Sequence, residues 1–235
     1  MRSEKLAALG TLLSGVAHEL NNPLSNISTS AQLLDEELEN GETSFKRQMI
    51  TQIEEQTDRA RDIVRSLLEF SRTKTFTRQQ LPLKKLLNET IVLVRGQVPT
   101  KVDIAIDIPD DIQIFADKQR IQQVFLNLIK NAIDAVEENG HVILSARTIR
   151  GKAGGVPEEV EIFVEDDGPG IDPANLRHIF DPFFTTKDVG KGSGLGLFIV
   201  HDIIESHGGS IRVESRPGMG TTFILWLPSA KESQQ

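Results

Sequence analysis

The sequence predicts a multi-domain protein: an α-helical hairpin that pairs with a second copy into a dimeric four-helix bundle, followed by an α+β sandwich. Two observations carry this prediction. Between residues 6 and 38, apolar side chains recur at alternating steps of three and four, which is the seam of a coiled-coil-like helix. Beyond residue 80, short alternating runs are interleaved with helical ones, a pattern typical of a mixed sheet with helices on one face.

The first helix is expected to end at Asn40-Gly41-Glu42, where Gly41 supplies a stop. A second apolar stripe then runs from Ile53 to Leu67. Two helices joined by so short a turn bury little by themselves, so we favour a homodimer formed through these N-terminal helices. The alternative is a hairpin that packs on the second domain of its own chain. The seam of the first helix comprises Leu6, Leu9, Leu13, Val16, Leu20, Leu24, Ile27, Ala31, Leu34 and Leu38.

A polar and basic segment, residues 71–80, separates the two domains, and Leu81-Pro82 disfavours continuation of the helix. We therefore predict domains at 1–76 and 77–229, with a tail at 230–235. The second domain is expected to hold helices over 83–98, 118–138 and 193–207, and strands over 102–108, 112–115, 141–149, 160–165, 210–214 and 221–227.

Composition narrows the classes of function. The 235 residues carry a net charge of −8, which argues against nonspecific nucleic-acid binding. The sequence has no cysteine, so disulfides, thiolate metal sites and cysteine nucleophiles are excluded. No apolar run approaches the ~20 residues of a membrane span. We expect a cytoplasmic chain without membrane contact of its own, whose full-length protein could be anchored through a sensor region upstream.

His18 begins the run HELNNP, residues 18–23. It lies two residues from the seam positions on either side, so at about 100° per residue it points away from the seam. Glu19 places a carboxylate beside it that favours a reactive tautomer. Pro23 removes a helical hydrogen bond and predicts a bend nearby. We interpret His18 as a nucleophile; the alternative is an ordinary solvated histidine.

Two further motifs suit a nucleotide. Asn127 and Asn131 are four apart on one predicted helix face, and their neutral oxygens suit Mg²⁺ that shares phosphate ligands. For an isolated pair, the alternative is two ordinary solvated side chains on the helix surface. Asp166 lies where a strand ends, so its carboxylate can accept from the exocyclic amine of adenine. Gly168 and Gly170 allow the backbone to approach the base closely.

The glycine run with Gly192, Gly194 and Gly196 opens a predicted helix, and at a helix N-terminus the backbone amides and the helix dipole favour phosphate. The run lacks the Gly-Lys-Ser/Thr of a P-loop, and no apolar strand leads into it as in a Rossmann fingerprint. Lys187 either reaches a phosphate or is an ordinary solvated lysine, and the sequence leaves both open.

Residues 18–23 resemble the H-box of sensor histidine kinases of two-component systems. The later motifs, with residues 180–184 between them, resemble the N, G1, F and G2 boxes of histidine-kinase catalytic domains within the GHKL ATPase group. The resemblance spans about residues 4–227 and implies a Bergerat-type ATP-binding fold. It implies phosphorylation of His18, with Glu19 as general base and Asn22 assisting phosphatase activity. It also implies that Asp166 accepts from the adenine amine, that Asn131 binds Mg²⁺ and that Asn127 binds the metal or the phosphates. The resemblance further implies that Gly192, Gly194 and Gly196 lie beneath the phosphates.

The expected function is ATP- and Mg²⁺-dependent autophosphorylation of His18, then transfer to an aspartate on the receiver domain of a response regulator, with regulator phosphatase activity. One alternative is an ATP-driven clamp of the gyrase B or MutL type, which needs no histidine bundle. Another is a scaffold or phosphatase with a dead ATP site, against which the intact motifs speak. The remaining histidines lack metal-ligand spacing and are expected to be structural or surface residues: His141, His178, His201 and His207.

Overall fold

The computed structural model describes residues 2–38, 41–71, 76–136, 139–149, 159–187, 192 and 194–229. The chain divides into two compact units. The first unit comprises Met1–Thr73 with Asp181–Leu195, and the second comprises Lys74–Phe180 with Gly196–Gln235.

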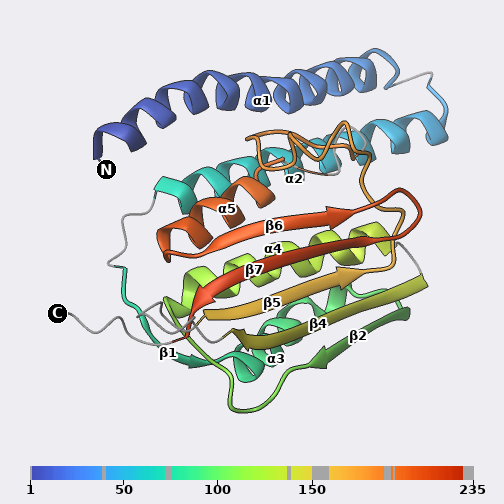
Figure 1. Cartoon of the computed structure of the whole chain (residues 1–235). Coiled ribbons are helices and arrows are strands. Elements are labelled where there is room, and N and C mark those ends of the chain that lie inside the picture. Colours follow the sequence, from blue (N-terminus) through green and yellow to red (C-terminus); the bar gives the residue numbers. More distant parts are fainter. Residues whose placement is uncertain are drawn as a thin grey trace. The chain divides into compact units, whose positions relative to one another are not determined.

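The first unit is built on a helical hairpin. Helix α1 spans Arg2–Glu36 and runs through Pro23, and helix α2 spans Thr43–Ser71. The two helices run antiparallel (Figure 1), as the stop at Asn40-Gly41 predicted, although residues 39–40 lie outside the described part. Neither of these helices, nor any other in the described residues, is long and apolar enough to cross a membrane.

Only part of the predicted seam faces the partner helix. The side chains buried in the hairpin include Val16 of α1 with Met49 and Ile63 of α2. Leu24 and Leu38 of the predicted seam are instead 55% and 58% exposed. Since one helix covers only one stripe of its neighbour, the hairpin leaves several large apolar side chains open to solvent. These exposed side chains are Leu24, Leu33, Leu38, Ile50 and Val64.

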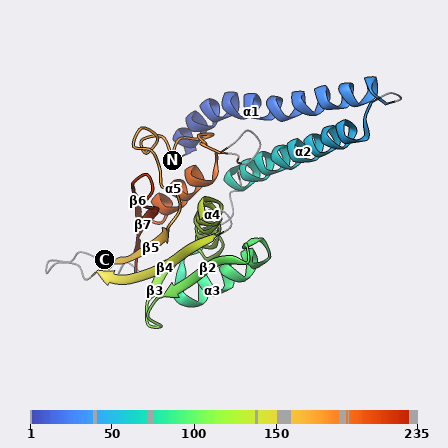
Figure 2. The ribbon, with the colours of Figure 1, turned by 90° about the vertical axis from the view of Figure 1, so that its right-hand side faces the viewer.

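The second unit is a mixed sheet with its helices on one face, as predicted (Figures 1 and 2). The five-stranded sheet has the order β2-β4-β5-β7-β6, in which β2 and β4 are parallel and the other neighbours antiparallel. The strands are β1 (Gln79–Pro82), β2 (Lys101–Asp107), β3 (Gln113–Ala116), β4 (Asn139–Ile149), β5 (Glu159–Asp166), β6 (Ser210–Ser215) and β7 (Thr221–Pro228). The helices are α3 (Leu83–Val94), the short 3₁₀ helix η1 (Arg95–Gln97), α4 (Lys118–Val136) and α5 (Gly196–Ser206).

The core of this unit lies between the sheet and helices α4 and α5. Alternate side chains of the central strands face it, because successive residues of a strand point to opposite sides. Helix α4 contributes a stripe that is buried along its whole length. The fully buried side chains of this core include Phe125, Leu128, Ile129, Leu144, Ile162, Ile204 and Leu225.

Some element boundaries differ from the sequence-based prediction. Gln79–Pro82, partly inside the predicted linker, forms β1 and pairs antiparallel with β3. A strand of four residues can be recognised only by its pairing with a strand that is distant in sequence. Pro82 is tolerated because it is the last residue of the strand. Helix α3 stops at Val94 and continues as the 3₁₀ turn. The described helix α5 begins at Gly196, whereas the predicted start, Ser193, lies outside the described residues.

Candidate functional site

The predicted acceptor residues lie on the middle of α1. His18 and Asn22 are both exposed, and their spacing of four residues places them one helical turn apart on the same side of the helix. Glu19, which follows His18, is only partly exposed. The histidine therefore remains accessible, while the neighbouring carboxylate turns toward α2.

The carboxylate of Glu19 has a partner on the other helix. Arg59 of α2 donates from Nη2 to Glu19 Oε2 at 2.9 Å. Sequence reasoning named Glu19 but missed Arg59. Its spacing could have indicated that Arg59 faces the interior of the hairpin, because it lies three residues after Gln56 and four before Ile63, and both of these are buried.

The paired asparagines lie on α4. Both are half-buried, and Asn127 donates from Nδ2 to the backbone oxygen of Gly196 at 3.3 Å. The start of α4 is held by Asp117, whose Oδ1 accepts from the backbone N–H of Gln119 and of Arg120, an N-cap arrangement. Asn127 thus links α4 to the first residue of α5, where the last predicted phosphate-loop glycine lies.

Asp166 is the last residue of β5, which ends beside α4 (Figure 1). Its Oδ1 accepts from the backbone N–H of Gly168 at 3.0 Å. Burial raises the pKa of the Asp166 carboxyl above its ordinary value, although backbone N–H donors from Gly168 and Thr221 oppose this rise. A partly desolvated carboxylate at a strand end is suited to accept a hydrogen bond from a ligand amine.

The two glycines after Asp166 are required by close backbone contacts. A Cβ at Gly168 would meet the Ala135 carbonyl of α4 at 3.0 Å. Gly170 has a φ of +75°, and a Cβ there would collide with the carbonyl of Arg216. The turn between β6 and β7 also fastens this loop, since Gly218 donates to the Pro169 oxygen at 2.7 Å. This support was not predicted from the sequence.

The carboxylate of Asp167, next to Asp166, is hydrogen-bonded to His141. Asp167 accepts from the backbone N–H of His141 at 2.7 Å, and its other oxygen lies 2.9 Å from His141 Nδ1. These hydrogen bonds lower the pKa of Asp167 and raise that of His141. His141 is therefore a surface residue in an ion pair, and of the two adjacent aspartates only Asp166 is partly buried.

The remaining predicted ligands fall in the first unit. Lys187 is exposed and Gly192 is half-buried, while Gly194 has a φ of +64°. In the same unit the ring of Phe183, a residue with a φ of 67°, lies 2.8 Å from where Gly15 would carry a Cβ. The second unit holds the other predicted ligands, which are Asn127, Asn131, Asp166, Gly168, Gly170 and Gly196.

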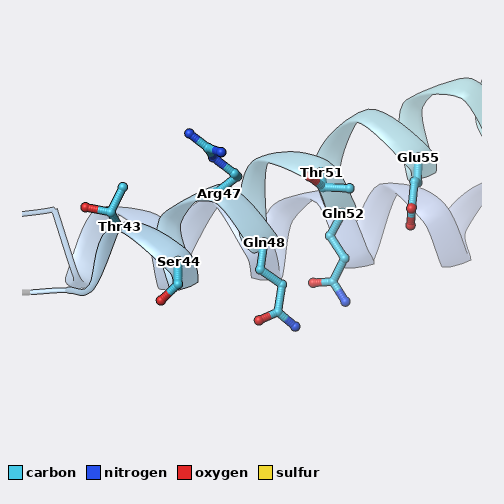
Figure 3. A pocket seen from close by; sticks show the side chains of 7 residues that line it. All are labelled: Thr43, Ser44, Arg47, Gln48, Thr51, Gln52 and Glu55. Atoms are coloured by element: carbon cyan, nitrogen blue, oxygen red, sulfur yellow. The ribbon is translucent and has the colours of Figure 1, made fainter.

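A polar groove of about 800 Å³ follows the first turns of α2 (Figure 3). None of the residues predicted from the sequence to bind or react lines it. Figure 3 shows Gln48 and Gln52 pointing to one side of α2 and Arg47 to the other. The lining residues are Thr43, Ser44, Arg47, Gln48, Thr51, Gln52 and Glu55.

Two family models match the chain. Residues 8–75 match the His Kinase A (phospho-acceptor) domain, the region that holds His18, Glu19 and Asn22. Residues 116–231 match the histidine kinase-, DNA gyrase B-, and HSP90-like ATPase model, the region that holds the predicted nucleotide ligands.

Similar proteins cover nearly the whole chain. The sensor histidine kinase ZraS of Escherichia coli strain K12 is 39% identical over 97% of this chain and 47% of its own length. The histidine-protein kinase AtoS of the same organism is 36% identical over 100% of this chain and 37% of its own. The chain thus spans about half the length of these curated relatives, or less.

Solved structures of the same kind share the fold. The histidine kinase ThkA in complex with the response regulator protein TrrA matches with a TM-score of 0.78 and 32% identity, over 100% of this chain and 66% of that one. The isolated catalytic domain of ThkA matches with a TM-score of 0.55 and 35% identity, over 66% of this chain and 97% of that one.

Proposed function

This chain belongs to the sensor histidine kinases of two-component systems, and we propose that it transfers the γ-phosphoryl group of ATP to His18. The observation that carries the proposal is the presence of both halves of the reaction on one polypeptide. An exposed histidine lies in the phospho-acceptor match, and Asp166 with its glycine loop lies in the ATPase match. An ATP-driven clamp would need only the second half.

Nucleotide binding rests on the residues around β5 and α4. The partly buried Asp166 carboxylate would accept from the adenine amine, and Gly168 and Gly170 would admit the ring. The amide oxygen of Asn131 is a hard ligand of the kind that Mg²⁺ accepts while it keeps waters and phosphate oxygens. In the described residues no group of three or more acidic or histidine side chains could hold a metal. A Mg²⁺ ion that enters with ATP would neutralise phosphate charge.

The acceptor step uses the α1 residues. One ring nitrogen of His18 forms a bond to the γ-phosphorus while the bond from phosphorus to the β–γ bridging oxygen breaks and ADP leaves. The proton on the other ring nitrogen passes to the Glu19 carboxylate, the general base. The catalytic contribution of this chain is mainly positioning and charge, as in other phosphoryl transfers.

The phosphoryl group then passes to an aspartate on a response-regulator receiver domain. The solved complex of the relative ThkA with TrrA supports this class of partner. Asn22, exposed one turn beyond His18, would position a water for dephosphorylation of the regulator. The exposed apolar side chains of the hairpin support a homodimer, and because ATP is the proposed donor, we expect the reaction to take place in the cytoplasm.

Labelling with ATP carrying a radioactive γ-phosphate tests the acceptor. The wild-type chain should acquire acid-labile, alkali-stable label, the behaviour of a phosphohistidine. His18→Ala should acquire none and should bind ATP with unchanged affinity by calorimetry, because His18 lies on α1, outside the predicted ligands. The matched control is His178→Ala, which removes another exposed histidine and should label normally. Phosphohistidine that persists on His18→Ala would refute the proposal.

A further inference from the structure

The ion pair between Arg59 and Glu19 is unusual for this chain in its burial. The Arg59 side chain is 10% exposed and that of Glu19 is 21% exposed. Every other ion pair recorded among the described residues has a partner that is 44% exposed or more. The pair joins the two helices at the level of the acceptor histidine, because Glu19 directly follows His18.

Stability does not explain this pair. Of the buried side-chain nitrogen and oxygen atoms in the described part of the chain, Arg59 Nε is the one without a hydrogen-bond partner. A buried donor left unpaired costs free energy, and a buried ion pair is commonly no more stabilising than apolar side chains of similar volume. The apolar Ile63, one turn away on α2, is fully buried, so the same interface accepts an apolar residue. A charged pair retained here points to a use other than holding the helices together.

We propose that Arg59 is a positioning residue for phosphoryl transfer to His18, acting through Glu19. The guanidinium holds the carboxylate on one side of α1, next to an imidazole that remains exposed. During transfer the His18 ring proton moves to the carboxylate as the nitrogen–phosphorus bond forms and ADP leaves; Arg59 keeps its own protons. This inference rests on the proposed function, and it adds the residue on α2 that makes the base available.

The test compares Arg59→Met with Arg61→Met in the full chain. Arg61 lies on the same helix and pairs with Asp58 at 2.6 Å, but both side chains are more than 60% exposed, at 68% and 66%. The initial rate of autophosphorylation is measured at saturating Mg²⁺-ATP, together with the KM for ATP. Arg59→Met should lower kcat on the order of 10- to 100-fold without changing KM, and Arg61→Met should change neither. A wild-type kcat for Arg59→Met would overturn the proposal.

A double-mutant cycle with Glu19→Gln separates positioning from simple structural support. If Arg59 acts through Glu19, then adding Arg59→Met to Glu19→Gln should cost no further kcat. Independent, multiplicative losses would overturn the proposal. If Glu19→Gln lowers kcat and Arg59→Met does not, the role proposed for Arg59 is refuted and that of Glu19 is not. A normal Glu19→Gln refutes the base, and with it this inference, while the labelling of His18 still tests the kinase itself.

A third variant covers the case in which Arg59→Met does not fold, judged by circular dichroism. Arg59→Lys keeps the positive charge but not the planar, multiply donating group. It should retain part of the rate, between that of wild type and that of Glu19→Gln, with an unchanged melting temperature. A wild-type rate for Arg59→Lys, or a rate as low as that of Glu19→Gln, would contradict positioning of the carboxylate by the guanidinium.

Discussion

The helical hairpin and the sheet unit bury their side chains in different ways. Between α1 and α2, polar Ser30 and Gln56 are 5% and 6% exposed, and Ser30 donates to Gln52 across the interface at 3.2 Å. In the sheet unit, the largest fully buried side chains are all apolar, with Phe125 and Leu128 at the centre of α4. Both units expose some large apolar side chains, but they differ in how much they enclose: among the described side chains, Ile63 is the one large, fully buried side chain of the hairpin, whereas the sheet unit encloses a core of many such side chains.

This difference separates two tasks. A nucleotide site needs a fixed backbone, and the dense core around α4 and β5 supplies it. The proposed phosphoryl acceptor, His18, must stay accessible to a donor and then to a partner, and it is an exposed residue of the two-helix hairpin. Each prediction below tests one side of this contrast.

The largest effect on ligand binding is expected at the nucleotide site. Asp166→Asn removes a charged acceptor, and a lost charged hydrogen bond is worth about 1.5–3 kcal/mol. ATP affinity measured by calorimetry should therefore fall roughly 10- to 100-fold, with an unchanged circular dichroism spectrum. The matched control is Asp167→Asn, whose carboxylate pairs with His141 and which should bind ATP normally. Equal losses for both variants would argue against Asp166 as the base-reading residue.

A pair of leucine substitutions tests the contrast in burial directly. Leu128→Ala should destabilise the sheet unit by about 2–5 kcal/mol, as large-to-small changes in a packed core do. Leu24 is 55% exposed, so Leu24→Ala should hardly change the stability of a single chain but should weaken the dimer. Sedimentation and thermal melts at two protein concentrations measure both effects, with the neighbouring exposed Ser28→Ala as control. Melting that does not depend on concentration, in wild type and Leu24→Ala alike, would contradict association through the hairpin.

A smaller and more selective effect is expected at Asn22. Asn22→Ala should slow dephosphorylation of the regulator more than autophosphorylation, because Asn22 is proposed to hold a water and takes no part in attack on ATP. Glu19→Ala should show the opposite preference. Both rates are measured at saturating regulator, so that weaker docking does not enter. Equal losses in the two rates for Asn22→Ala would contradict a role of Asn22 that is specific to dephosphorylation.

The smallest effect concerns His207, which is fully buried at the end of α5. Its Nε2 accepts from the backbone N–H of Asp117 at 3.0 Å, and its Nδ1 lies 2.7 Å from the Ile203 oxygen. This pattern fits the neutral ring, with Nδ1–H as donor. Burial lowers the pKa of His207, with Arg78 and Arg120 acting in the same direction, while the Ile203 hydrogen bond and Asp117 oppose the shift.

The sign of the pH effect follows from this lowered pKa. Below the ordinary histidine pKa of about 6.5, the unfolded chain takes up a proton that the folded chain resists. The stabilisation by neutral His207 should therefore be complete above that pH and be lost as the pH falls toward the lower folded value. Thermal melts between neutral and mildly acidic pH should show a steeper decline for wild type than for His207→Asn. Parallel declines would contradict a neutral, buried His207.

Much of the fold and of the candidate site could be predicted from residues that are near each other in sequence. The apolar repeat predicted the hairpin, and the alternating runs predicted β4, β5 and β7 to within a few residues. The glycines after Asp166 predicted a close approach of the backbone to the base, and this stays a prediction; what the structure shows is that a Cβ at Gly170 would collide with the carbonyl of Arg216. The short strand β1 was missed because its pairing with β3 lies far along the chain.

The sequence by itself was enough to predict which residues would carry the chemistry, because the spacing of four between Asn127 and Asn131, the histidine–glutamate pair and the glycine runs are local patterns. Only the tertiary structure decided the partners of these groups. It paired Glu19 with Arg59, forty positions away, and it directed Asp167 to His141 and away from Asp166. The reason is physical: periodicity specifies which face of an element is apolar, but the register between two packed elements decides which polar atoms meet.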